Sequence, residues 1–90
     1  MSLAPAHDPA HVRRHHLSLL AREVGARGLG WRLAGPQASV LAVVAPVSGR
    51  QVMVVAMPSG AGWSYLWTGG GFADVTAAAG VADQIARQLS

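Results

Sequence analysis

The side chains best suited to hold a transition metal are four histidines near the start of the chain: His7, His11, His15 and His16. On a helix, residues four apart share a face, so His11 and His15 have the spacing of a two-histidine metal pair. Asp8 adds a carboxylate nearby, but Arg13 and Arg14 would repel a divalent cation. We therefore expect a solvated first helical turn without a resident metal, with His11 and His15 as weak candidate ligands.

A glycine-rich motif, Gly69-Gly70-Gly71, is expected to lead from a strand directly into a helix. Backbone N–H groups at the start of a helix can hold an anion, which makes Gly69, Gly70 and Gly71 candidates for an anion-binding loop. The chain has no Lys, and neither the Walker pattern nor the dinucleotide glycine spacing is present. Asp74 would also repel an anion from this helix start. A plain flexible connection is therefore the expectation.

Three aromatic residues alternate along one predicted strand and so share one of its faces: Trp63, Tyr65 and Trp67. Trp31, on another predicted strand, joins them if the sheet aligns the two. Such a stripe either packs in a core beneath helices or forms a protein interface, and the pattern leaves both open. Stacking on nucleic-acid bases needs a basic groove as well, whereas only Arg32 and Arg50 are basic in the sheet region. Nucleic acid is therefore an unlikely partner.

The residues that could act as general acids and bases are poorly placed for catalysis. The four acids are far apart in the sequence: Asp8, Glu23, Asp74 and Asp83. Asp74 and Asp83 are nine residues apart and would lie on opposite sides of a helix. No serine, histidine and acid share a recognisable context, and the predicted strands contain no His, Asp, Glu or Lys. We expect no enzymatic activity and no cofactor.

Composition bounds the class of protein. The chain has 90 residues, of which 51% are hydrophobic and 12% are charged, and this is too apolar for a disordered chain. We therefore expect one domain over residues 1–90, with a flexible arm at residues 1–7. The absence of cysteine excludes disulfides and cysteine zinc sites. The seven arginines are scattered and the net charge is only +3, so no basic face for nucleic acid is indicated.

The start of the chain lacks the apolar stretch of a signal peptide. The longest apolar run, Val40–Val47, is too short to cross a bilayer, which takes about 20 residues. We therefore expect a cytoplasmic protein with no membrane partner.

The hydrophobic periodicity predicts a helix, four strands and a second helix. The expected bounds are a helix from Asp8-Pro9 to about Ala26, strands at Leu29–Leu33, Val40–Val47, Gln51–Met57 and Trp63–Thr68, and a helix from Ala73 or Asp74 to Gln88. Short connections favour antiparallel pairing. The expected fold is therefore α+β, a four-stranded antiparallel meander with both helices on one face of the sheet.

The second and third predicted strands, Val40–Val47 and Gln51–Met57, are apolar on both faces. Two helices that pack together on one face leave the other face uncovered. A solvated face of an antiparallel sheet is normally polar, so an apolar one is expected to meet another protein surface. The simplest such surface is a second copy of the chain across a two-fold axis, and we expect a homodimer.

The C-terminal half shows a family resemblance. The segment Gly62-Trp-Ser-Tyr-Leu-Trp-Thr-Gly, followed by Asp74 and the apolar positions up to Leu89, resembles a class of small uncharacterised actinobacterial proteins. In these proteins an aromatic-rich strand precedes a short loop and a final amphipathic helix. The resemblance implies an accessory binding role beside regulatory proteins, and it brings no catalytic residues with it.

Taken together, these patterns predict a non-enzymatic protein-interaction or accessory regulatory domain that associates with itself, with a regulatory protein as a further possible partner. The interface candidates are the aromatic residues Trp31, Trp63, Tyr65 and Trp67. The alternative is a module that binds a small ligand or an anion through the sheet face and the Gly69–Gly71 loop.

Overall fold

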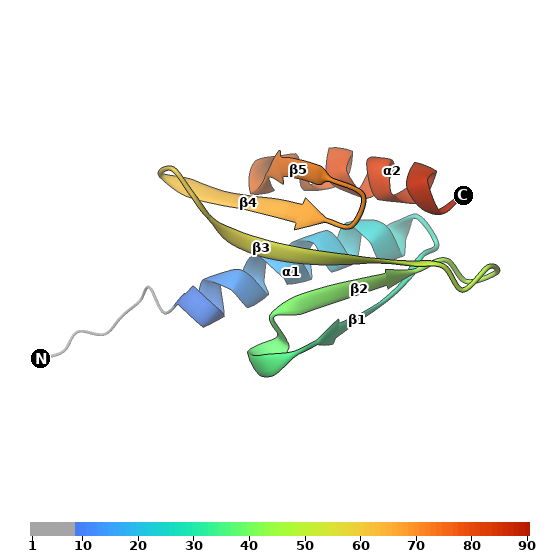
Figure 1. Cartoon of the computed structure of the whole chain (residues 1–90), viewed down its shortest axis with the longest axis horizontal. Coiled ribbons are helices and arrows are strands. Elements are labelled where there is room, and N and C mark those ends of the chain that lie inside the picture. Colours follow the sequence, from blue (N-terminus) through green and yellow to red (C-terminus); the bar gives the residue numbers. More distant parts are fainter. Residues whose placement is uncertain (1–8) are drawn as a thin grey trace, which may run out of the picture.

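The computed structural model describes residues 9–90, so the arm expected at residues 1–7 lies outside the described part of the chain. In the described part, the chain forms a helix, then five strands, then a second helix (Figure 1). Their bounds are α1 Pro9–Ala26, β1 Gly30–Ala34, β2 Val40–Val44, β3 Gln51–Ser59, β4 Gly62–Trp67, β5 Gly71–Asp74 and α2 Ala78–Leu89. Short 3₁₀ turns at Pro36–Ala38 and Val75–Ala77 precede β2 and α2.

The five strands form one antiparallel sheet in the order β1-β2-β3-β4-β5, as Figure 1 shows. The predicted α+β class with an antiparallel meander is therefore confirmed. The meander follows from its short links, which can join antiparallel neighbours but not parallel ones. The tightest link is the two-residue loop between Ser59 and Gly62, where Gly60 takes a positive φ of 60° that suits a hairpin turn.

The prediction of four strands is wrong, because the segment after the glycines forms a fifth. Gly69 and Gly70 have φ values of 101° and 86° and turn the chain back, so that Gly71–Asp74 pairs with β4. The ring of Trp67 lies over Gly71, where a Cβ would overlap the indole. Glycine at this position lets the large ring lie flat across the neighbouring strand. The second helix consequently begins at Ala78 and not at Ala73 or Asp74.

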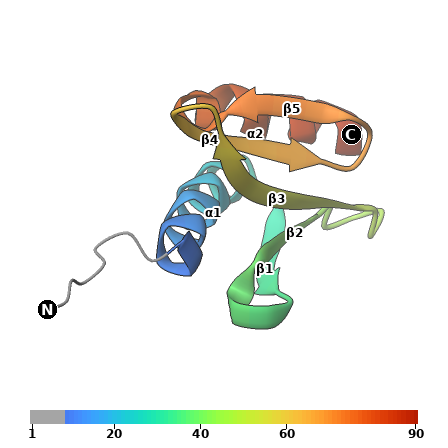
Figure 2. The same cartoon turned by 60° about the vertical axis from the view of Figure 1, so that its left-hand side comes forward.

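Both helices pack against the same face of the sheet (Figures 1 and 2). The buried side chains of α1 and α2 meet the inward residues of the three central strands in one core. The helix members of this core are Leu17, Leu20, Ala21, Val24, Val81, Ala82, Ile85 and Leu89. The sheet members are Leu41, Val43, Ala45, Val52, Val54, Ala56, Tyr65 and Trp67. Neither of the described helices lies against the opposite face of the sheet.

The end of α1 is fastened to α2 by one arginine. The Nε of Arg27 donates to Asp83 at 2.7 Å, and an Nη donates to Glu23 at 3.0 Å. The same guanidinium also donates to the backbone carbonyls of Glu23 and Ala79. These bonds hold the two helices side by side over one face of the sheet. Neither α1 nor α2 has the length and apolar character needed to cross a membrane, within the residues described.

Candidate interaction surface

The uncovered side of the sheet, which we call the outer sheet face, carries a continuous row of apolar side chains. Leu66 lies opposite Val55 on one side and Phe72 on the other, and Ala34 lies opposite Val40. Val40 and Val55 come next to the paired residues of β2 and β3, so they complete the row. Residues directly opposite in an antiparallel pair point to the same face. The row therefore crosses all five strands without a polar interruption.

The most exposed apolar side chains of the outer sheet face are Phe72, in the row, and two methionines beside it. Phe72 is 62% exposed, and Met53 and Met57, on either side of the row, are 40% and 43% exposed. Val55 and Leu66 are half-buried between them. Sheet faces that meet water usually carry polar residues at alternate positions, and contiguous exposed apolar residues mark contact sites. The outer sheet face thus has the composition that is typical of contact surfaces.

Charge on the outer sheet face is confined to two residues near opposite corners. Arg32 on β1 lies in line with Ala42 and Met53, whereas Asp74 on β5 lies in line with Ser64. Among the outward positions of the described strands, these two alone are ionisable. The face as a whole is therefore neutral and has one charge of each sign.

The carboxylate of Asp74 has a fixed position. It accepts hydrogen bonds from the backbone N–H of Thr76 at 2.8 Å and from its hydroxyl at 2.7 Å. These bonds, the backbone one first, lower the pKa of Asp74 below its ordinary value. Asp74 is consequently ionised at neutral pH.

The aromatic stripe lies on the covered face and belongs to the core. Tyr65 and Trp67 are buried, Trp63 is half-buried, and Trp31 is 48% exposed at the edge of the sheet beside Gly25 of α1. Tyr65 and Trp67, which the sequence left open between core and interface, are therefore not available to a partner. The residues that replace them as surface candidates are Met53, Met57, Leu66 and Phe72.

Tyr65 is the most buried residue of the aromatic stripe. Its hydroxyl donates to the backbone carbonyl of His16 at 2.5 Å, which ties β4 to α1. Burial raises the pKa of Tyr65 to about 12. The phenol is thus held neutral, as a core residue requires.

The glycine motif, a candidate anion-binding loop in the sequence, forms a turn between two strands. Gly69 and Gly70 make the turn between β4 and β5, while Gly71 is the first residue of β5. The turn packs beside α2 through Gln88, whose amide donates to the carbonyl of Thr68 at 2.7 Å. Because α2 starts only at Ala78, the glycines lie away from a helix N-terminus and lack the geometry that would hold an anion there.

The histidines do not assemble a metal site in the described residues. His11 and His15 are exposed on α1, and no three His, Asp or Glu residues of the described chain lie close enough to hold an ion. His7 and Asp8, the other members of the predicted cluster, lie outside the described residues.

His16 instead takes part in packing. Its ring leans on Trp63 with centroids 5.5 Å apart, and its Nδ1 is buried without a hydrogen-bond partner in the described structure. Burial and then the neighbouring His15 lower the pKa of His16, while Asp74 opposes them. The guanidinium of Arg13 lies over the ring of Trp63, 5.6 Å from its centroid, and its Nε donates to the carbonyl of Ala56. The cluster docks the first half of α1 onto the sheet.

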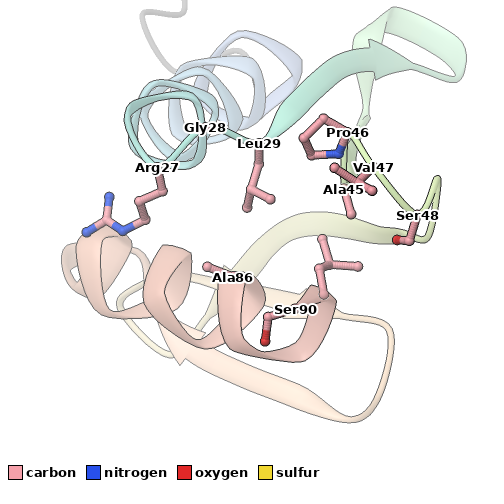
Figure 3. Close-up of a pocket in the computed structure, with 10 residues that line it drawn as sticks. Arg27, Gly28, Leu29, Ala45, Pro46, Val47, Ser48, Ala86 and Ser90 are labelled. Carbon is pink, nitrogen blue, oxygen red and sulfur yellow. The ribbon is translucent and has the colours of Figure 1, made fainter.

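A groove of about 490 Å³ lies between the ends of the two helices and the β2–β3 loop (Figure 3). Its lining is mostly apolar and includes Leu29, Ala45 and Leu89. Arg27, the charged residue in the lining, already pairs with two carboxylates, so it offers little attraction to an anion. Val47 stands at the rim and is 98% exposed.

In comparisons with known proteins, no family model, no curated protein and no solved structure matches this chain.

Proposed function

We propose that this protein is a non-enzymatic protein-interaction domain, with an accessory or regulatory role, that docks through its outer sheet face. The observation that carries the proposal is the uninterrupted apolar row, in which Phe72 is exposed, with Met53 and Met57 exposed on either side of it. Covering the exposed part of each of these three side chains would contribute roughly 1 kcal/mol to binding. A partner surface is the simplest means of removing this apolar area from water.

The distribution of polar groups supports binding rather than catalysis. Within residues 9–90, no outward side chain of the sheet is a nucleophile paired with a base, and the two ionisable ones, Arg32 and Asp74, lie on opposite edge strands. Catalysis needs such groups held within reach of one reacting atom. A neutral apolar centre with single charges near the corners has the anatomy of a protein interface.

Oxidation of Met53 and Met57 tests the proposal, because both residues are exposed in the isolated chain. Peroxide oxidation, followed residue by residue by mass spectrometry, would be compared between dilute purified protein and fresh lysate of cells that make the protein. We expect both methionines to react several-fold more slowly in the lysate. A V47M variant supplies a reference methionine away from the outer sheet face, and its rate should not change. If Met53 and Met57 each react as fast in the lysate as in the purified protein, the proposal is contradicted.

A second candidate function is the binding of a small apolar ligand in the groove of Figure 3, whose size falls in the range of ligand pockets. A thermal-shift screen with small apolar metabolites tests it. A ligand at a hundred times its Kd would raise Tm by about 10 °C or more in a domain of this size. An A86W variant, which fills the groove, should abolish the shift. A screen without a shift, or a shift that A86W retains, would count against this candidate.

A further inference from the structure

We infer that the partner of the outer sheet face is a second copy of this chain, stacked face to face so that Arg32 of each copy meets the partner's Asp74. The inference rests on the proposed function and names the occupant of the same surface. Three properties of the face support it: its charge pattern, its area and its relief.

The charge pattern is complementary to itself. A two-fold interface sets residue i against residue j and, at the same time, j against i. Arg32 and Asp74 lie across a diagonal of the face, on β1 and β5. A two-fold axis between the stacked sheets and perpendicular to that diagonal places each residue over the other, so two ion pairs form together. An axis along the diagonal would place like charges together, so the charges select one arrangement.

The area matches a small reversible dimer. Five strands spaced about 4.8 Å apart, with about six residues each at 3.3 Å, give a footprint near 480 Å². Stable dimers remove about 800 Å² of accessible surface from each partner, and accessible surface exceeds the flat footprint because side chains protrude. The stacked pair therefore lies at the low end of the stable range. We expect a dissociation constant in the micromolar range.

The relief of the face suits interdigitation. Phe72, Met53 and Met57 stand out, while Val55 and Leu66 lie lower between them. In packed sheets, the raised side chains of one copy fill the lower positions of the other across about 10 Å. Methionine adapts its shape easily and is common where surfaces meet. A single face that holds both the raised and the lower positions can pack against itself.

Sedimentation of charge-exchanged variants tests the arrangement. R32D has acids near both corners of the face, and D74R has bases near both, so each variant should repel its own copy. We expect each alone to dimerise about 30-fold more weakly than the natural chain. An equimolar mixture of the two restores both ion pairs, and it should associate within about threefold of the natural strength. The mixture also shows that neither variant is merely unfolded.

The outcomes separate this inference from the proposed function. A mixture no stronger than the single variants would overturn the stacked arrangement. A natural chain that stays monomeric at all concentrations, with Met53 and Met57 protected only in lysate, would overturn the second-copy inference and leave the proposed function standing. Methionines that are unprotected in every sample would overturn both.

Discussion

The two faces of the sheet come from the same strands and use similar residues, yet one is covered and the other is bare. On β3, Val52, Val54 and Ala56 point into the core, while Met53 and Val55 point outward. The described residues form two helices, α1 and α2, and both pack over one face. Apolar residues alone therefore do not make a core. The difference lies in what covers them, and the bare face is the surface on which we propose that a partner docks.

The largest expected difference between the faces is in the stability lost when a leucine is replaced by alanine. Leu41 is fully buried under the helices, whereas Leu66 is half-buried on the outer sheet face. Leu41→Ala should lower the free energy of unfolding by about 3 kcal/mol, because it leaves a cavity. Leu66→Ala should cost about 1 kcal/mol or less in dilute protein. Urea denaturation of both variants measures this, and equal losses would remove the distinction between the faces.

The next largest effect is expected at alkaline pH. The pKa of Tyr65 is raised from 10.0 to about 12, so the unfolded chain loses its phenolic proton first. The stability that this neutral phenol contributes is fully present below pH 10 and is lost as the pH rises toward 12. The loss amounts to roughly 2–3 kcal/mol.

Because Tyr65 is the single tyrosine of the chain, phenolate absorbance reports on it alone. The conservative variant Tyr65→Phe gives up the hydrogen bond to His16, at a cost of about 1 kcal/mol, and should remove this alkaline loss. An absorbance midpoint near pH 10 in the folded protein would contradict the burial described.

A smaller contrast is expected between two strand glycines. Gly71 lies under the ring of Trp67, whereas a Cβ at Gly62 would meet nothing within 4 Å. Gly71→Ala should displace the indole and cost about 2 kcal/mol, and Gly62→Ala should be close to neutral. Thermal unfolding with tryptophan fluorescence follows both changes. Equal stability of the two variants would show that Trp67 does not need the space over Gly71.

The smallest effect is expected at mildly acidic pH. The pKa of His16 is lowered mainly by burial, so the folded chain resists protonation more than the unfolded chain does. The stability due to neutral His16 is complete above pH 6.5 and is lost as the pH falls through its folded pKa. Urea midpoints across this range should fall for the natural chain and fall less for His16→Gln. Parallel curves would contradict the assignment to His16.

The sequence was sufficient to predict the elements whose hydrophobic residues recur with a clear period. The 3.6-residue spacing of Leu17, Leu20 and Val24 marks α1, and its predicted end at about Ala26 agrees with the structure. Strand ends were less certain: the predicted Val40–Val47 stops at Val44, because Ala45 and Arg50 close the following loop by a backbone hydrogen bond. Local hydrophobicity does not predict such a turn.

The surface on which the proposed function rests was the hardest to predict. Alternation along β4 correctly groups Trp63, Tyr65 and Trp67 on one face, but it does not say which face the helices choose. Phe72 was missed altogether, because three glycines in a row suggest a break and not a turn between paired strands. The packing of Trp67 on Gly71 becomes visible only when the strands are paired.

The most direct test compares two exposed apolar residues that lie on different surfaces. Phe72 is on the outer sheet face, and Val47 is at the tip of the β2–β3 loop, where it is even more exposed. Sedimentation equilibrium would be measured for the natural chain, Phe72→Glu and Val47→Glu across the micromolar range. We predict that Phe72→Glu is monomeric while Val47→Glu dimerises like the natural chain. Dissociation by Val47→Glu, with Phe72→Glu still dimeric, would contradict the role of the outer sheet face.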